Sequence, residues 1–494
     1  MKFIKTILRG FFKPKPSPSK KFRLLFFLIN FVLATAVVVT LHYTEDLVIF
    51  KEIKDTSLDW IMYWHSDFDP KPRIQRMALF EIDDKTYRRW DSPVITPRDK
   101  LKALIEAAKK GGANVIAVDI MLSWFSDGCL HQPNQTATCP PADASADKKL
   151  ADYLHTINES EADETPIIIL TRLYRPPLEN GEVNDEAFLT KPPSFLDEVL
   201  KEEKNVFWAS TFMVVDDDKM LRRWQLAPLV CQNNHLTVVP SMQLLAALAQ
   251  LYATNNSTRQ AAQVIRDFKT QWNQWASQFP CEPSQGTTLV QLCQHQACPQ
   301  FTIELPKKAR VSTQNHTVDL VGGRHTEKII YRFAPPDNPA IMQRSLIDIK
   351  SAMNVLKEDV DVDNQIVLIG ITHQESSDYH QVPIRAEEIS GVYILANAID
   401  TLLRFGQFKQ QPFAKQVIVS AILIIITTLI FTYYDMAKAS LFCSLLFGLL
   451  ILLSMKAMHH GIEIDVALRL LTIQFTEFML RFVGFWKFLQ AKLS

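Results

Sequence analysis

Three patterns follow one another between residues 77 and 119: MALFEIDD (77–84), TPRDKLKALIEAAKKGG (96–112) and ANVIAVD (113–119). The first and last are short apolar runs rich in strand-forming residues, and each ends on aspartate. The middle pattern has helical periodicity, so the three together predict a strand–helix–strand unit with parallel strands. The carboxyl ends of parallel strands border a crevice, and we expect Asp83 and Asp119 at that edge.

The helix expected within residues 96–112 has clear start and stop signals. Thr96 is a suitable N-cap, and Pro97 suits the first helical position. Gly111 or Gly112 can adopt the left-handed conformation that closes a helix. Apolar residues recur at i, i+3, i+4 and i+7 and predict one buried face, formed by Leu101, Leu104, Ile105 and Ala108.

The overall composition is balanced in charge but strongly segregated along the chain. The chain has 494 residues, a formal net charge of zero and 47% hydrophobic residues. A neutral chain gives no support for nucleic-acid binding, which depends on a basic surface. Apolar residues gather at the two ends, whereas the middle has the composition of a water-exposed α/β domain. The sequence therefore predicts contact with a lipid bilayer at both ends.

The amino-terminal end has the pattern of a membrane anchor. Residues 1–23 are basic and contain no acidic residue, and residues 24–41 are nearly all apolar. About 20 apolar residues span the hydrocarbon core, and the basic flank stays in the cytoplasm. The segment after this span would then be exported. A cleavable signal peptide is the alternative, although its small-residue site at 34–36 lies inside the apolar run.

Three apolar segments follow the middle region. Residues 417–434 and 439–458 are predicted transmembrane helices, and residues 462–486 either span or lie in the interface as an amphipathic helix. Acid and base pairs at i, i+4 spacing partly neutralise each other in this last segment. These charged residues are candidate contacts for a membrane partner: Asp465, Arg469, Glu477 and Arg481. Four spans would leave residues 487–494 as a short cytoplasmic tail.

Residues 42–412 would form one large exported domain, and its cysteines fit an oxidising compartment. Six of them lie here and are disulfide candidates whose pairing stays open: Cys129, Cys139, Cys231, Cys281, Cys293 and Cys298. A Cys129–Cys139 bridge is the easiest to propose, because both residues lie in one polar loop. Zinc is the weaker alternative, because no CxxC pair occurs. We predict no metal and no cofactor.

Apolar periodicity predicts further elements of this domain. Strands are expected at 166–173, 206–215, 327–333 and 365–371, and helices at 146–157, 240–251, 255–279 and 392–404. The polar stretch 124–163 around the first of these helices has the composition of a loop or insertion.

Several short blocks occur in a characteristic order. They are Ile82-Asp83-Asp84, Thr96-Pro97-Arg98, residues 112–119, Asp216–Arg223, Pro240-Ser241 and Tyr331-Arg332-Phe333; the most specific block, at 365–403, holds Ile366–Gly370, Asp378, Pro383, Gly391-Val392 and Ala396–Asp400. This order resembles the CHASE type 2 family, extracellular sensory domains associated with cyclases and histidine kinases. The resemblance covers most of residues 58–403 and leaves insertions near 124–163 and 252–325.

The resemblance implies an α/β domain with a mixed or parallel sheet, flanked by one amino-terminal and three carboxyl-terminal transmembrane helices. It implies a bacterial inner-membrane protein with a large periplasmic domain, and a serine-led helix at 345–349. Two departures concern Ser390, where the family usually has proline, and the turn at 216–221, which lacks the expected glycine. The family commonly continues into a cytoplasmic output domain. Here the sequence stops at Ser494, so we expect a separate protein to receive the signal.

Polar residues at the strand ends form the candidate ligand site. Its members are Asp83, Asp84, Asp119, Asp378 and His380, with Arg98 as a candidate ion-pair partner of the acids. Clustered carboxylates can bind a divalent cation or a cationic ligand, but aspartates after strands also cap helices and close turns. Arg222 could meet an anionic ligand, or it could form a surface salt bridge. His373 and His380 could together bind metal, although loop histidines usually contact only water.

The sequence gives little support for catalysis. Gly-x-Ser-x-Gly, GxxxxGK[ST] and GxGxxG are all absent, and we expect no enzyme. The preferred function is a membrane-anchored periplasmic sensor that relays to, or docks, a separate membrane or envelope protein. A homo-oligomer is plausible, and the small-molecule ligand is unknown. The alternatives are a non-signalling envelope scaffold or assembly subunit, and a periplasmic hydrolase that uses the acidic residues.

Overall fold

The structure, a computed structural model, describes most of the middle of the chain. Described are residues 77–123, 144–172, 194–216, 218–232, 235–255, 257–281, 326–331, 347–383, 388–406, 413–434 and 436–458, with shorter pieces at 28, 31–32, 35–36, 52–53, 55–62, 174, 178–179, 182–183, 191–192, 409–410 and 462–463. The chain forms two compact units, Asp69–Gln407 and the two ends Met1–Phe68 with Phe408–Ser494. Each unit is described by itself.

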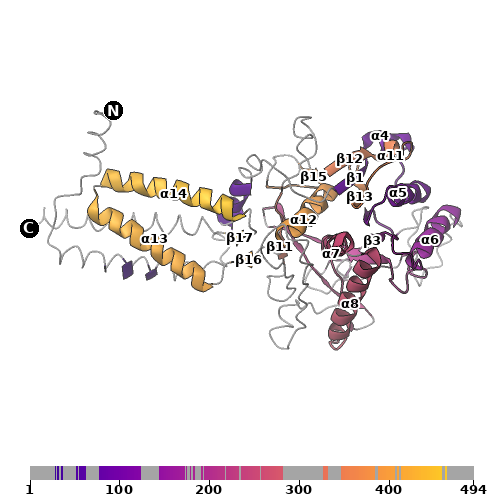
Figure 1. The fold of residues 1–494 in the computed structure, drawn as a ribbon, viewed down its shortest axis with the longest axis horizontal. Coiled ribbons are helices and arrows are strands. Elements are labelled where there is room, and N and C mark those ends of the chain that lie inside the picture. Colours follow the sequence, from indigo (N-terminus) through magenta and orange to yellow (C-terminus); the bar gives the residue numbers. More distant parts are fainter. Residues whose placement is uncertain are drawn as a thin grey trace, which may run out of the picture. The chain divides into compact units, whose positions relative to one another are not determined.

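A six-stranded parallel sheet forms the centre of the larger unit (Figure 1). Its strands, in spatial order, are β12 (Ile347–Ser351), β1 (Met77–Ile82), β13 (Ile366–Ile371), β2 (Val115–Asp119), β3 (Ile167–Arg172) and β6 (Val206–Ser210). Every pairing within this sheet is parallel. The predicted α/β class with parallel strands is therefore confirmed.

Helices cover both faces of the sheet, which explains why its inner strands are continuously apolar. One face packs against α5 (Arg98–Lys110), α6 (Ala144–Asn158) and α11 (Ala352–Val355). The other packs against α7 (Met242–Asn255), α8 (Thr258–Ala276) and α12 (Gly391–Phe405). Alternation along β1 sends Met77 and Leu79 toward α12 and its neighbours, and Ala78 and Phe80 toward α5.

Helix α5 has the predicted apolar face, but it begins one residue later than expected. Leu101, Leu104, Ile105 and Ala108 are all buried. Pro97 is the N-cap, since its carbonyl accepts the first helical bond, from the Leu101 amide at 3.0 Å, while its ψ of 124° is not helical. The expectation that Thr96 caps the helix is therefore wrong. At the other end, Gly112 adopts the left-handed conformation with φ of 86°.

Some long-range features differ from the expected arrangement. Strand β13 lies between β1 and β2, although it follows them by about 250 residues. The expectation of a serine-led helix at 345–349 is wrong. Residues Ile347–Ser351 instead form strand β12, which pairs with β1. Helix α6, in the first predicted insertion, is the crossover between β2 and β3 and contributes to the core. Helix α8, in the second, contributes to the core on the opposite face.

Smaller elements surround this sandwich. One is the short helix α4 (Asp84–Arg89). Two are hairpins, β4 (Leu178–Glu179) with β5 (Glu182–Val183) and β9 (Leu229–Gln232) with β10 (His235–Val238). The others are a three-stranded sheet of β7 (Met213–Val215), β8 (Leu221–Gln225) and β11 (Thr326–Lys328), and the strand pair of β14 (Tyr379–His380) with β15 (Ile389–Ser390). A disulfide joins Cys231 to Cys281. The other four disulfide candidates lie outside the described residues.

The smaller unit contains the apolar carboxyl-terminal helices. Helix α14 (Met436–Met458) contains a segment, Lys438–Ala457, that is long and apolar enough to cross a membrane. Helix α13 (Phe413–Tyr433) contains a shorter apolar segment, Ile418–Ile430. The two helices pack through a small cluster that includes Leu423, Ala439 and Cys443.

The predicted last helix does not begin at residue 462. Ile462–Glu463 instead forms strand β17, which pairs in parallel with β16 (Lys409–Gln410). The backbone at these two positions therefore pairs with another segment and does not form helical hydrogen bonds. Residues 464–494 lie outside the described part, as does most of the predicted span at 24–41. Those spans, and the partner contacts Asp465, Arg469, Glu477 and Arg481, stay predictions.

Candidate functional site

The carboxyl edge of the sheet carries a row of polar residues on the face covered by α12. Glu81 of β1 pairs in register with Gly370 of β13, and Gly370 pairs with Asp119 of β2. Thr171 of β3 donates a hydrogen bond from Oγ1 to Asp119 Oδ1 at 3.2 Å. Four adjacent strands therefore present two acids and a hydroxyl around a glycine. We call Glu81, Asp119 and Thr171, with the residues that contact them, the carboxyl-edge site.

Gly370 is required because α12 begins directly over the centre of this row. A Cβ atom at Gly370 would lie 2.5 Å from Val392 Cγ2 and 2.7 Å from Val392 Cβ. The Val392 side chain thus lies so close to the Gly370 backbone that no side chain fits at position 370. The amino-terminal turn of α12 therefore packs on the strand that lies between the two acids of the row.

A loop after β13 brings two further polar residues to the site. His380 Nε2 lies 3.0 Å from Asp378 Oδ1, and the Gly391 amide at the start of α12 donates to the Asp378 carbonyl at 2.9 Å. Tyr379 anchors the loop by donating from its hydroxyl to the Thr372 carbonyl at 2.6 Å. Asp378 thus lies beside the positive end of the α12 dipole, which favours a carboxylate there.

Asp119 is the most strongly perturbed acid of the site. Burial, and then the charge of Asp378, raise the pKa of the Asp119 carboxyl to about 7, against the opposing effects of the Thr171 hydrogen bond and of His380. Its ionisation is therefore poised near neutral pH. Perturbed acids of this kind occur frequently at functional sites, because a small change nearby alters their charge.

Glu81 belongs to the site, although the sequence prediction omitted it. Its Oε2 accepts hydrogen bonds from the Tyr393 hydroxyl at 3.1 Å and from Thr372 Oγ1 at 3.2 Å. Burial raises the pKa of Glu81, and the two hydrogen bonds oppose this. A signal was present: Glu81 is a charged residue inside an apolar strand, at a position whose alternation places it on a covered face.

Asp83 and Asp84 serve the local fold. Asp83 Oδ1 caps α4 by accepting from the Thr86 amide at 2.8 Å, and it also accepts from Ser351 Oγ at 3.2 Å. Asp84 Oδ1 accepts from the Gln374 amide at 3.1 Å. Both acids are thus engaged in the capping and turn contacts that the sequence left open as the alternative.

The two histidines have different surroundings. The His373 ring stacks on Tyr87 with centroids 3.9 Å apart, and burial lowers its pKa. His380 instead contacts Asp378. Among the described residues, no group of three or more metal-ligating side chains is arranged to hold a metal ion.

The two candidate arginines pair with acids outside the carboxyl-edge site. Arg98 is buried, and its Nε lies 3.5 Å from Asp147 Oδ1 of α6. Burial lowers the pKa of Arg98 to about 10, while Asp147 opposes that shift. The expected pairing of Arg98 with a strand-end aspartate is therefore replaced by a pairing between two neighbouring helices on one face of the sheet.

Arg222 has two carboxylate partners. Its Nη1 lies 3.2 Å from Asp216 Oδ2, and its Nη2 lies 2.7 Å from Asp218 Oδ2. Arg223 also pairs with Asp216, at 2.5 Å. This agrees with the salt-bridge alternative, although Arg222 is buried and not on the surface.

Comparison with known proteins gives one match. A family model described as the CHASE2 domain matches residues 32–433, which include the whole α/β unit and helix α13. The resemblance drawn from the sequence is confirmed by this match. No curated protein and no solved structure matches the chain.

Proposed function

The chain belongs to the CHASE2 domain family, a family of extracellular sensory domains, and on that premise we propose that it is a membrane-anchored sensory protein. Its α/β unit lies in the periplasm of a bacterial cell, and its ends lie in the inner membrane. The unit receives a signal, and the membrane helices pass the resulting change to a separate protein. A sensor of this kind needs two states that the signal stabilises unequally.

The observation that carries this proposal is the extent of the family match. It runs from residue 32 through the α/β unit to residue 433, and the apolar segment Lys438–Ala457 comes directly after it. The disulfide between Cys231 and Cys281 further supports an exported location, because disulfides persist in oxidising compartments.

Helix α12 supports a route from the carboxyl-edge site to the membrane. The helix begins at Gly391, whose amide bonds Asp378, and its Tyr393 bonds Glu81. It ends at Phe405, and residues 406–412 join it to α13. A change in charge at Asp119 or Asp378 alters the electrostatic environment of the first turn of α12. We expect this change to move α12 and, through the chain, α13.

The location is tested by labelling in intact cells. We introduce one exposed cysteine by Asp361→Cys, at the opposite edge of the sheet, and add a protein tag at each end of the chain. We expect a membrane-impermeant maleimide to label this cysteine while the inner membrane is intact, and both tags to resist external protease. Labelling that requires inner-membrane permeabilisation would rule out a periplasmic α/β unit.

The relay is tested by purifying the intact chain in mild detergent and identifying bound proteins by mass spectrometry. We expect Asp119→Asn to change the amount of bound partner, because it removes the charge next to α12. Asp361→Asn is the matched control, since Asp361 is exposed and precedes β13. A stoichiometric complex that is the same in all three proteins would favour the scaffold function.

A further inference from the structure

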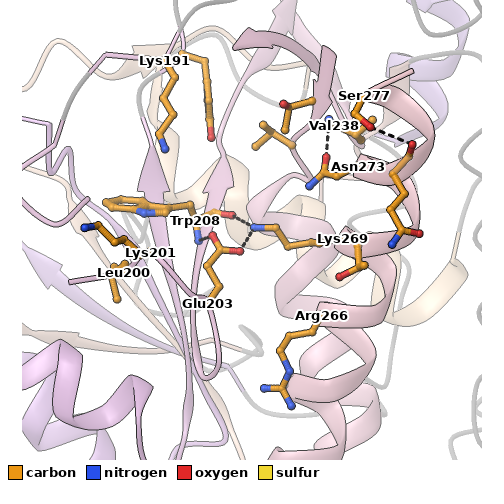
Figure 2. A pocket seen from close by; sticks show the side chains of 15 residues that line it. Lys191, Leu200, Lys201, Glu203, Trp208, Val238, Arg266, Lys269, Asn273 and Ser277 are labelled. Carbon is orange, nitrogen blue, oxygen red and sulfur yellow. Dashed lines mark hydrogen bonds and ion pairs between the residues drawn. The ribbon is translucent and has the colours of Figure 1, made fainter. Parts of the chain in front are cut away.

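A cavity at the β6 side of the sheet is lined by residues that do not belong to the carboxyl-edge site. This open cavity of about 690 Å³ is lined by residues 191, 200, 201 and 203, strand β6, the β9–β10 hairpin and helix α8 (Figure 2). This volume is within the usual range for small-molecule pockets. Polar residues of α8 contribute one wall at helical spacing: Arg266, Lys269, Thr270, Asn273 and Ser277.

The described lining of this cavity carries an excess of positive charge. Four of its residues are cationic and one is acidic: Lys191, Lys201, Arg266 and Lys269 against Glu203. Lys269 pairs with Glu203 and also donates to the Trp208 carbonyl at 3.2 Å. In Figure 2, Lys191 extends toward Trp208 from above, and Lys269 reaches it from α8 on the right. Two acids outside the lining also lie near its cations, since Glu198 Oε2 is 2.7 Å from Lys201 Nζ and Asp197 Oδ1 is 3.6 Å from Lys191 Nζ. The four cations of the lining therefore have three acids close to them.

Arg266 bonds to neutral acceptors. Its Nη1 donates to the Lys204 carbonyl at 2.7 Å, and its Nη2 donates to Gln263 Oε1 at 2.5 Å. These bonds fix the guanidinium in place without neutralising its charge. An anion in the cavity would gain from this prepositioned charge, since a guanidinium matches carboxylate and phosphate geometry.

Lys191 shares its acid with a second cation. Asp197 accepts from Arg172 Nη1 at 2.7 Å and from Arg172 Nη2 at 2.9 Å, while Lys191 Nζ lies 3.6 Å from Asp197 Oδ1. Burial, and then the charge of Arg172, lower the pKa of Lys191. The Asp197 carboxylate thus faces two cations, Arg172 and Lys191. An anion that enters the cavity would neutralise the remaining positive charge.

Asn273 supplies an oriented hydrogen-bond donor. Its Oδ1 accepts from the Val238 amide at 3.0 Å, which identifies its other terminal atom as the amide nitrogen. The wall of α8 therefore combines fixed positive charge with neutral donors.

We propose that this cavity binds a small organic anion carrying two or more carboxylate or phosphate groups, contacted by Lys191 and Asn273 and attracted by the positive charges of Arg266 and Lys269 on the α8 wall. Cations on more than one wall of the cavity favour a ligand with more than one anionic group. This inference is independent of the proposed signalling role, because it requires only binding.

The test measures binding of citrate to the full chain in detergent by isothermal titration calorimetry, with inorganic phosphate and glycerol as comparison probes. We expect citrate to bind, its affinity to fall as salt is added, and glycerol to give no binding heat. Asn273→Asp keeps the acceptor for the Val238 amide and adds a negative charge to the cavity. It should weaken citrate binding by about tenfold or more, because like charges would then meet.

Gln260→Glu is the matched control, because it adds the same charge to the same helix at an exposed position outside the cavity. It should change citrate affinity by less than about twofold, since exposed charges are screened. Arg266→Gln and Lys191→Gln should each weaken binding, and circular dichroism checks that each variant folds. The proposal is overturned if citrate does not bind, whether or not phosphate binds. It is also overturned if Asn273→Asp and Gln260→Glu change citrate affinity equally.

Discussion

Glu81 and Asp119 occupy the same register row of the sheet, on β1 and β2, separated only by Gly370 of β13. Two acids that are 38 positions apart in the chain thus lie on either side of a position without a side chain. The first turn of α12 occupies the space above Gly370, where Val392 packs. Tyr393 of the same turn donates from its hydroxyl to Glu81 Oε2 at 3.1 Å, so α12 is in direct contact with an acid of the row.

Replacing Gly370 with alanine tests this close packing. The added methyl would lie 2.5 Å from Val392 Cγ2, so α12 must shift or the strand must distort. Overpacking of this kind costs about 1–3 kcal/mol of unfolding free energy. Denaturant unfolding followed by tryptophan fluorescence measures the loss. Gly448→Ala, where an added Cβ meets nothing within 4 Å, should show no such loss. Wild-type stability of Gly370→Ala would contradict the contact.

Stability should fall with rising pH because of Asp119. In the unfolded chain this carboxyl ionises near pH 4, whereas the folded pKa is raised to about 7. Between these values the folded state binds more protons, so unfolding free energy decreases as pH rises. At about 1.4 kcal/mol per pKa unit, the decrease is at most about 4 kcal/mol.

The Asp119→Asn variant should remove most of this decrease. Melting temperatures measured from pH 4 to pH 8 should fall less steeply with pH in Asp119→Asn than in the wild type. Asp361→Asn removes an exposed carboxylate and should retain the wild-type slope. Equal slopes in all three proteins would show that the Asp119 carboxyl is not perturbed by folding.

The Arg98–Asp147 pair should be important for stability because both side chains are buried. Arg98→Met leaves Asp147 buried without its cation, and breaking a buried pair costs about 3–5 kcal/mol. The double variant Arg98→Met with Asp147→Leu should lose less than the sum of the two single losses. Lys110→Met breaks the exposed pair with Asp359 and should cost less than about 1 kcal/mol. Urea unfolding of the four variants measures these differences.

Reduction of the Cys231–Cys281 disulfide should lower stability by about 2–5 kcal/mol, because the bond restricts the unfolded chain. Cys231→Ser with Cys281→Ser should lower stability by a similar amount without reductant. Non-reducing peptide mapping should recover the 231–281 linked peptide. A map that pairs Cys231 with another cysteine would contradict the structure.

Local sequence patterns were sufficient to predict these helices and strands and the face that each of them buries. Residues 77–119 predicted two strands and a helix, because apolar spacing of two or about 3.6 residues records which face of an element is buried. The same reasoning located β13 and α12 and placed Asp119 at the strand ends. These features depend on neighbours within a few residues of one another along the chain.

Long-range pairing could not be inferred in this way. Strand β13 is one of several similar apolar runs, and its place between β1 and β2 results from burying all of them at once. That insertion brings Glu81 into the row of Asp119 and explains Gly370. In the same way, the docking of α6 on the sheet gives Arg98 its partner Asp147, and the packing of α8 beside β10 brings Cys281 to Cys231. Each of these outcomes depends on segments that compete for the same partners across the whole fold, so no local pattern encodes them.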